Sequence, residues 1–305
     1  MRTTMSHAPV MLREVLECLR PTGGDVILDA TFGAGGYTRA ILDSNNSCGV
    51  IAIDRDDGAA PFADDVKKEY GERFNFYNLK FSEVKSVLEN NSLDGIVLDL
   101  GVSSMQLDNG ERGFSFNKKA PLAMTMGRNN LTAFDVVNNY GESQIADIIY
   151  NYGNEVKSRI IAKKIAQRRK NRPIENTEEL ADIARSCFAG KEKKIDNATK
   201  TFQALRIFVN DELNELKIML EYSIDLLRSG GRLAVVSFHS LEDRIVKNFF
   251  RENGDGNVKK INKYREESPR AIFRVLTKRP TVVSPGEIGL NHRARSAKLR
   301  GGIKC

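Results

Sequence analysis

The stretch Val26–Tyr37, which reads VILDATFGAGGY, decides the fold class of this chain. It begins as a short apolar run that closes on Asp29, and it continues through Gly33, Gly35 and Gly36 into a segment of helical character. Glycines at such a turn let the backbone approach a ligand closely, and the helix that follows offers free N–H groups. This order of strand, glycine loop and helix is typical of a nucleotide-binding α/β sheet.

Further apolar runs without alternation predict strands that are buried on both faces of a parallel sheet. They lie at 49–54, 74–79 and 94–100, and strand character returns at 232–238, 271–277 and 296–303. Helical periodicity replaces it from about 131 to 208, and 252–268 reads as a polar loop. Strands that alternate with helices imply right-handed βαβ units, so the predicted fold class is α/β. The expected domains are a discontinuous sheet domain, 1–108 with 205–305, and an inserted helical domain, 109–204.

The composition excludes several classes of protein. Of the 305 residues, 41% are hydrophobic and 29% are charged, which is unlike a disordered or fibrous chain. No apolar run approaches the roughly 18 residues of a membrane span, and Met1–Pro9 lacks the apolar stretch of a signal peptide. Four scattered cysteines without a CxxC pair indicate neither a disulfide framework nor a zinc site. We therefore expect a cytoplasmic protein without membrane contact or metal, and the composition leaves a homodimer open.

Basic residues gather in two segments of a chain whose net charge is +7. Eight of them and no acid occupy Lys157–Arg172, which we expect to be a helix. Five more, again without an acid, follow Ile288, and Arg293–Arg300 reads as a basic tail. Such clusters are the electrostatic footprint of a nucleic-acid partner, although a solvated helix face and a loose tail account for them equally well.

The glycine loop fits two cofactors. Asp54 ends the second predicted strand 21 residues after Gly33, where a carboxylate typically accepts hydrogen bonds from ribose hydroxyls. A dinucleotide loop would have its third glycine at the position of Thr38. S-adenosylmethionine instead carries a cationic end, and Asp29 offers that end a complementary charge. The residues therefore favour S-adenosylmethionine, with a dinucleotide as the alternative.

Two further side chains are expected at the same edge of the sheet. Asp99 ends the fourth predicted strand, where it could accept a hydrogen bond from an exocyclic amine and orient the nitrogen lone pair. It could equally cap the next helix. His239 follows the fifth strand as a second catalytic candidate, but a structural role is the commoner one, and Ser240 with Asp243 fits a capping box. The G-x-S-x-G elbow of serine hydrolases and the zinc-deaminase signature are both absent from the sequence.

Six stretches of the chain resemble one family, the ribosomal RNA small subunit methyltransferases H. They are Asp29–Gly36, Ala52–Asp56, Leu98–Ser104, Glu111–Phe116, Ala198–Ile207 and Ser237–Lys247, and the matches extend from Ser6–Val10 to Arg293–Arg300. The resemblance implies a class I, Rossmann-like methyltransferase sheet with an inserted all-helical domain that binds RNA. It also implies that S-adenosylmethionine methylates the N4 amine of a decoding-centre cytidine in 16S rRNA of the small ribosomal subunit, leaving S-adenosylhomocysteine.

Carried over by motif, the resemblance also implies a set of site residues. The cofactor would contact Gly35, Gly36, Tyr37, Asp54, Phe81, Asp99 and Gln106. Asp99 would orient the amine with help from His239. Phe81 would stack on adenine, whereas its surroundings in the sequence alone indicate a core residue.

The chain departs from the family's pattern in one segment above all, Lys119–Gly127. Three charged residues of the family are replaced there by Ala123, Thr125 and Gly127. Milder departures are Tyr37 for a histidine, Met105 for a proline and Asn197 at the usual His-Pro start of its motif. These changes leave room for an alternative, a catalytically weakened or inactive relative that acts in ribosome assembly. A dinucleotide-dependent oxidoreductase is the third hypothesis.

Overall fold

The structure, a computed structural model, describes residues 9–108, 110–127, 129–188, 196–255 and 271–305. The chain divides into a sheet unit, 1–101 with 213–305, and a helical unit, 102–212. The boundaries therefore fall at 101 and 212, where 108 and 204 were expected. Val102 and Leu107 pack on the core of the helical unit and Leu205 is part of that core, so the segments around them belong to it.

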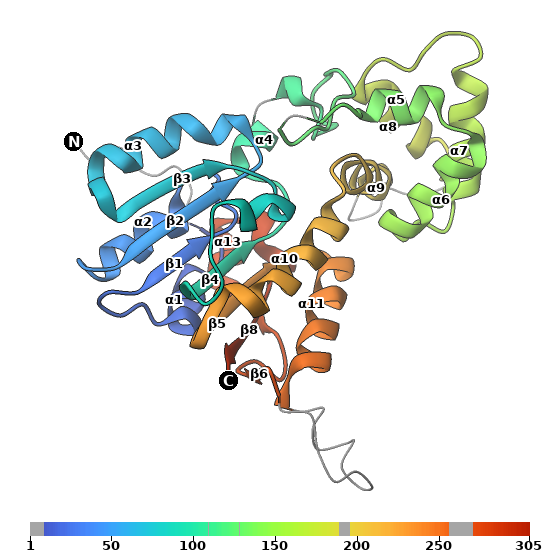
Figure 1. Ribbon diagram of the computed structural model, residues 1–305. Coiled ribbons are helices and arrows are strands. Elements are labelled where there is room, and N and C mark those ends of the chain that lie inside the picture. Colours follow the sequence, from blue (N-terminus) through green and yellow to red (C-terminus); the bar gives the residue numbers. More distant parts are fainter. Residues whose placement is uncertain (1–8, 109, 128, 189–195, 256–270) are drawn as a thin grey trace, which may run out of the picture. The chain divides into compact units, whose positions relative to one another are not determined.

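The sheet unit alternates strands and helices (Figure 1). Its elements are α1 (Leu12–Leu19), β1 (Val26–Asp29), α2 (Gly36–Ser44), β2 (Gly49–Asp54), α3 (Ala60–Tyr70), β3 (Phe74–Asn78), the 3₁₀ helix η3 (Phe81–Ser86), β4 (Leu93–Asp99), α10 (Glu212–Leu226), β5 (Leu227–Ser237), α11 (Ser240–Asn253), β6 (Phe273–Val275), β7 (Thr281–Val282), α13 (Pro285–Leu290), the 3₁₀ helix η5 (His292–Ser296) and β8 (Lys298–Lys304). The first residue of α10, Glu212, is counted with the helical unit.

The strands form one mixed sheet in the order β3-β2-β1-β4-β5-β8-β6, and β7 also pairs with β8. β1 to β5 are parallel, with Leu28 of β1 opposite Ile51 of β2 and Ile96 of β4. β8 runs antiparallel to β5, β6 and β7. The chain leaves β3 at one edge and returns on the other side of β1, so the topological switch point lies between β1 and β4. The predicted α/β class and its Rossmann-like sheet are confirmed.

Both faces of the parallel strands are covered, which the unbroken apolar runs predict. Leu28 and Ile96 belong to a core that also holds Leu220 of α10 and Phe249 of α11. On the opposite face, a Cβ atom on Gly95 would lie 3.4 Å from Leu19 of α1. Alternate residues along each strand therefore face different helical layers. β5 begins earlier than expected because the turn around Gly230, with φ of 84°, is enclosed as an irregularity in its pairing with β4.

The helical unit has its own core. Its helices are α4 (Ser104–Asp108), α5 (Ala133–Asn139), α6 (Glu142–Gly153), α7 (Ser158–Arg168), α8 (Thr177–Arg185) and α9 (Thr199–Val209). Ile149 of α6, Ile161 and Ile165 of α7, and Leu205 of α9 pack together inside it. Ile160 precedes the buried Ile161 in the same apolar run, but it is 51% exposed. α7 is shorter than the expected helix over 157–172, and Pro173 ends the polar turn that follows it.

The segment with the family departures, 119–127, is anchored by alternate residues. Leu122, Met124 and Met126 are buried in the helical core. Asn210 fixes the backbone between them, because its Oδ1 accepts from Met126 N and its Nδ2 donates to Met124 O, each at 2.7 Å. Ala123, Thr125 and Gly127 alternate with the buried residues and are only half-buried. The departures therefore change one side of a segment whose other side is packed.

Two expectations fall wholly or partly outside the described residues. α11 continues to Asn253, so the polar loop expected from 252 begins later, and its positions 256–268 lie outside the described residues. The same holds for 6–8, at the start of the stretch that resembles the family. Among the helices of the described ranges, none is both long and apolar enough to cross a bilayer.

Candidate cofactor and catalytic site

Four parallel strands of the sheet unit end in polar or acidic residues at one edge. β1, β2, β4 and β5 close on Asp29, Asp54, Asp99 and Ser237. Because the carboxyl ends of parallel strands lie at the same edge and the switch point falls between β1 and β4, this edge is where such a sheet binds a ligand. The structure thus places Asp29, Asp54 and Asp99 on one rim, as the sequence predicts.

The glycine loop between β1 and α2 needs its glycines for packing as well as for conformation. Gly35 has φ of 81°, and a Cβ atom there would lie 3.0 Å from the ring of Phe32. A Cβ atom on Gly36 would lie 2.4 Å from Pro9. Both positions therefore exclude larger side chains, and the loop runs as bare backbone into the first turn of α2.

Asp54 ties the glycine loop to the end of β2. Its Oδ2 accepts from Gly33 N at 2.8 Å, and its Oδ1 accepts from Asp56 N at 2.8 Å. Burial raises the pKa of this carboxyl to about 6, against the opposing effect of the two backbone donors. Each oxygen keeps a lone pair beyond these bonds, so Asp54 can still accept from a ligand hydroxyl.

Asp29 takes a different role from the one expected. It has no exposed surface, its Oδ2 accepts from Thr38 Oγ1 at 2.7 Å, and its Oδ1 accepts from Thr31 N at 3.2 Å. Burial raises its pKa to about 6. The side chain thus braces β1 against α2, and the expected contact with a cationic cofactor end has no support in this geometry. Thr38, noted in the sequence only as a missing glycine, supplies the hydroxyl donor for this brace.

Tyr37 and Phe81 contribute differently to the rim. The Tyr37 ring is 3% exposed and its hydroxyl donates to the carbonyl of Val10, so only its backbone could face a ligand. Phe81 opens η3 three residues after β3, and it is half-buried against the core under α10. Ser82 anchors this turn, since its N and Oγ both donate to Glu215 at 2.9 Å. Phe81 therefore has a core contact and an open side, and its adenine stacking stays a prediction.

Asp99 stands out because of the surroundings of one of its carboxyl oxygens. Its Oδ1 is buried and has no hydrogen bond within the described part of the chain. Its backbone N–H donates to Thr31 Oγ1 at 2.7 Å, which joins the ends of β4 and β1. Burial raises the pKa of the carboxyl well above its usual value, and the acids Asp29, Glu242 and Glu287 raise it further. The carboxyl does not cap a helix, so the capping alternative is wrong.

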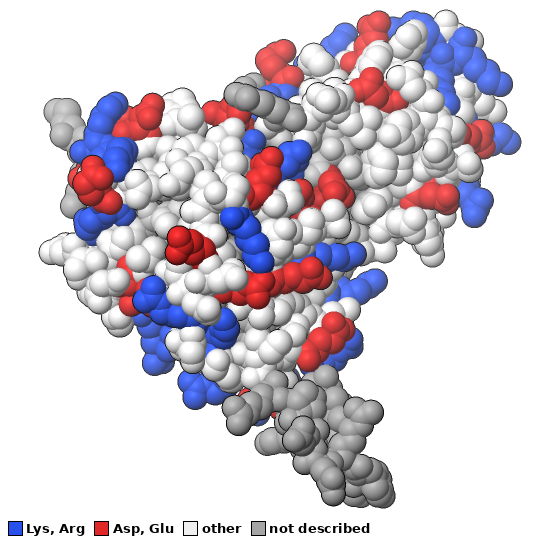
Figure 2. Space-filling model, viewed as in Figure 1, with Lys and Arg blue, Asp and Glu red and all other residues white. Residues whose placement is uncertain are grey.

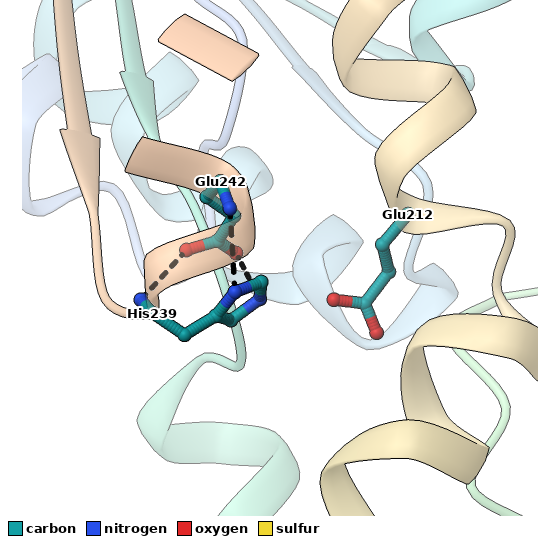
Figure 3. A group of neighbouring side chains, drawn as sticks. All are labelled: Glu212, His239 and Glu242. Atoms are coloured by element: carbon teal, nitrogen blue, oxygen red, sulfur yellow. Dashed lines mark hydrogen bonds and ion pairs between the residues drawn. The ribbon is translucent and has the colours of Figure 1, made fainter. Parts of the chain in front are cut away.

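His239 caps α11 (Figure 3). Its Nδ1 accepts from Glu242 N at 3.3 Å, and Glu242 Oε2 accepts in return from Phe238 N at 2.8 Å and His239 N at 3.2 Å. His239 Nε2 lies 3.0 Å from Glu242 Oε1 without hydrogen-bonding alignment. The capping box therefore joins His239 to Glu242, and the expected box of Ser240 with Asp243 is wrong. A catalytic part for His239 stays a prediction.

Glu242 is the residue of this edge that the sequence reasoning missed. It is only 2% exposed and holds the backbone where β5 passes into α11. The signal available was its spacing of three residues from His239, which is that of a cap and its reciprocal partner. A buried acid at this spacing could have been predicted from the sequence alone.

Two other acidic or amide side chains belong to the helical unit. Gln106 lies in α4, is 5% exposed, and accepts from Ser103 N through Oε1 at 3.0 Å. Glu212, also drawn in Figure 3, forms two 2.8 Å bonds with Arg206. Neither is assigned to the rim of the sheet unit, so a cofactor contact through Gln106 stays a prediction.

The rim fits S-adenosylmethionine on three observations. The Gly35–Gly36 backbone is free of side chains, Asp54 retains acceptor capacity at the end of β2, and the buried Asp99 Oδ1 is unpartnered in the described structure. A buried acceptor without a donor is costly, and a ligand donor or cation would offset that cost. This edge therefore suits a ligand that brings hydroxyl groups and positive charge together.

Most basic residues of the first basic segment bond to other parts of the protein, although they were expected to bind phosphate. Within 157–172, Lys157, Lys164, Arg168, Arg169 and Arg172 all bond to the helical unit itself. Arg159, Lys163 and Lys170 remain exposed, and Figure 2 shows several such basic side chains on this unit.

The expected basic tail consists of the 3₁₀ helix η5 followed by the strand β8. Lys298 and Arg300 of β8 pair with Asp243 at 3.1 and 2.8 Å, and Lys304 donates to the carbonyl of Leu227 at 2.6 Å. Arg300 is only 7% exposed. Lys298, Arg300 and Lys304 are therefore committed to the sheet, whereas the other two basic residues of the segment are exposed in η5. The strand predicted at 296–303 is confirmed, but its ion pairs with α11 are long-range contacts that the sequence does not show.

Comparison with known proteins agrees with these observations. Residues 4–304 match the MraW methylase family. The ribosomal RNA small subunit methyltransferase H of Rickettsia massiliae is 51% identical over 299 residues, 97% of each chain, and that of Rickettsia bellii strain RML369-C is 50% identical over 98% of each chain. Among solved structures, TrmN from Thermus thermophilus aligns with 97% of this chain and 48% of its own chain, at a TM-score of 0.44 and 11% identity. On the sequence matches and the strand order, the chain belongs to the MraW methylase family.

Proposed function

We propose that this chain transfers a methyl group from S-adenosylmethionine to the exocyclic N4 amine of a cytidine in the decoding centre of 16S rRNA. The observation that carries the proposal is the Oδ1 atom of Asp99, which is buried without a hydrogen-bond partner in the described structure, at the switch point beside a glycine loop. The names of the relatives, ribosomal RNA small subunit methyltransferase H, support the substrate class. The N4 position itself rests on the resemblance in sequence.

The chain's own residues provide binding and orientation. The backbone at Gly35 and Gly36, together with Asp54, would hold S-adenosylmethionine, which supplies an electrophilic methyl group when bound. Asp99 would accept from the substrate amine and direct the nitrogen lone pair, an effect of orientation that acts on the barrier. Glu242 and His239 act indirectly by fixing the end of β5.

The helical unit would contribute to RNA binding. Arg159, Lys163 and Lys170 are exposed on α7 and the turn after it, and exposed cations of this kind bind phosphate without reading sequence. Tyr150 of α6 is 58% exposed in the same unit and offers a ring on which a base can stack. RNA binding by this unit would therefore use these exposed side chains, and not all the basic residues of the segment 157–172.

The test is methyl transfer from labelled S-adenosylmethionine to small subunits that lack this methylation, followed by nucleoside mass spectrometry. N4-methylcytidine that disappears in Asp99→Asn supports the proposal. Label in another nucleoside would contradict the N4 assignment. Normal cofactor binding without transfer would contradict the enzyme and favour the ribosome-assembly alternative.

The segment 119–127 allows a sharper version of that test. Its buried side is intact, so Ala123→Asp with Thr125→Arg and Gly127→Asp restores the family's charges on the half-buried side only. Transfer that appears only in this restored variant would show that the departures silence an otherwise complete site. Transfer by the unaltered chain would show that they are tolerated.

A further inference from the structure

A hollow of about 360 Å³ lies beside α1 in the sheet unit. Its wall includes Arg232 of β5, which pairs with Gly95 near the beginning of β4, whereas Asp99 stands at the other end of that strand. The hollow is therefore distinct from the candidate cofactor site. Its lining comes from α1, β5, β7 and β8, from β6 and from the residues after β6.

The register of the sheet explains why basic side chains gather there. Arg232 of β5 and Arg274 of β6 both pair with Ile303 of β8, so all three side chains point to the same face of the sheet. α1 packs on this face so closely that a Cβ atom on Gly301 would lie 2.3 Å from Cys18 Sγ. The hollow is the part of the face that α1 leaves uncovered. Arg20, the C-cap residue that follows α1, also lines it.

The three arginines of this hollow lack a matching carboxylate. Arg232 Nη1 donates to Cys18 O at 2.9 Å, which leaves most of its donors unused. The guanidinium groups of Arg20 and Arg274 have no hydrogen-bond or ion-pair partner in the described residues. Burial lowers the pKa of Arg232, and the neighbouring charges of Arg20 and Arg274 lower it further.

Two acids also line the hollow, but they do not neutralise it. Glu17 is paired with Arg13 at 2.8 Å outside the arginine group. Glu14 is left as one carboxylate against three guanidinium groups. The hydroxyl groups of Thr277 and Thr281 are the other polar side chains of the wall. Like charges held together are unfavourable, and a bound anion would offset that repulsion.

We propose that this hollow binds a phosphate group, either of a small phosphate compound or of an RNA backbone. Guanidinium groups present paired donors that match the oxygens of phosphate, and three of them line this hollow, from the residue after α1, from β5 and from β6. The threonine hydroxyls can add donors. The proposal does not depend on methyl transfer, because the hollow shares no residue with the candidate cofactor site.

The test compares the unaltered full chain with Arg20→Gln/Arg274→Gln, a variant that leaves the Arg232 bond to α1 in place. Sodium pyrophosphate and radiolabelled 16S rRNA are the two probes, titrated at low ionic strength because screening weakens both. Loss of two charge-assisted contacts is expected to weaken binding by about tenfold to a hundredfold. Lys68→Gln/Arg251→Gln, which removes two cations of exposed ion pairs on α3 and α11, is the charge-matched control and should change neither affinity.

The two probes distinguish the sources of phosphate. Weaker pyrophosphate binding with unchanged RNA binding supports a small phosphate compound, and weaker RNA binding supports a backbone contact. Glu14→Gln removes the acid that faces the arginines and should tighten binding severalfold, which protects the test against a misfolded loss variant. Equal affinities of the double variant and the unaltered chain for both probes would overturn the proposal. Cofactor binding and methyl transfer, measured in parallel, report on the methylase separately.

Discussion

Gly33 and Asp54 are joined by a 2.8 Å hydrogen bond from the loop backbone to the carboxylate Oδ2. This bond explains how an acid 21 residues downstream belongs to the glycine loop, because β2 runs beside β1 and ends where the loop begins. The same carboxylate is the acceptor that a ribose would use. Binding of the cofactor and the shape of the loop are therefore linked through one side chain.

Asp54→Ala should weaken S-adenosylhomocysteine binding by about tenfold to a hundredfold, because hydrogen bonds to a charged acceptor contribute roughly 1.5–3 kcal/mol. Asp54→Asn keeps one carbonyl acceptor and should lose less. Asp65→Asn, on the exposed side of α3, controls for the change in charge. Isothermal titration measures all three, and an Asp54→Ala variant that binds normally would show that the loop holds the ligand without β2.

Asp99 should make cofactor affinity rise with pH. In the free protein its pKa is raised well above the usual value by burial and by Asp29, Glu242 and Glu287, so the carboxyl holds a proton at a pH where an ordinary acid would be ionised. A cationic ligand favours the carboxylate and therefore releases that proton. Affinity for S-adenosylmethionine should increase as pH rises toward the Asp99 pKa and then level off.

Asp99→Asn is the control for this pH dependence. The amide cannot ionise, so the variant should show a flatter affinity profile while its fold is kept. Calorimetry in two buffers of different ionisation enthalpy counts the protons released. A pH slope that is identical in the variant would place the titrating group elsewhere, with Asp29 and Asp54 as the next candidates, since the pKa of each is raised to about 6.

Asp29 should make the ligand-free protein lose stability as pH rises from about 4 to 6. Its folded pKa of about 6 exceeds the ordinary value of 3.8, so in this range the native state binds more protons than the unfolded state. The free energy of unfolding then falls with pH, by about 3 kcal/mol at most for this residue. Thermal unfolding across this range should show that stability falls less with pH in Asp29→Asn than in the unaltered chain. A fall of stability with pH that is equal or larger in the variant would contradict the assignment.

His239 can be tested as a cap against a role in catalysis. Asparagine is a good cap without an imidazole, so His239→Asn should keep kcat within a few-fold, whereas His239→Ala should lose about 1 kcal/mol of stability. Thermal unfolding and kcat are measured for both variants. If His239→Asn unfolds normally but loses kcat by about a hundredfold, a change of nearly 3 kcal/mol in the barrier, the imidazole itself takes part.

Much of the sheet unit could be predicted because its signals are local. Unbroken apolar runs mark β1 to β4, and glycines mark the loop after β1. Asp54 and Asp99 could be placed on one edge from strand order alone. Pairings between distant segments were out of reach. Arg300 bonds to Asp243 of α11, 57 residues away in the chain, and lies opposite Val235 in the antiparallel pairing of β8 with β5. No periodicity encodes either contact.

The role of Asp29 was misread for a related reason. Its place at the end of β1 was correct, but the donors that occupy it, Thr38 Oγ1 and Thr31 N, depend on how the loop turns back. Position on an edge can be deduced from the sequence, whereas the direction of a side chain depends on packing. Ile160 shows the same limit in the helical unit, since it is exposed beside the buried Ile161.

The exposed basic residues of the helical unit should set part of the salt dependence of RNA binding. Arg159→Gln with Lys163→Gln and Lys170→Gln removes three cations that lie in this unit's surface. If each contacts one phosphate, the slope of log K against log salt should fall by about 2, since each contact contributes about 0.7 for single strands. Filter binding of 16S rRNA over a salt series measures the slope. Lys68→Gln with Lys217→Gln and Arg251→Gln, three exposed cations of the sheet unit, is the charge-matched control. An equal fall in both variants would mean that net charge alone, and not the surface of the helical unit, governs binding.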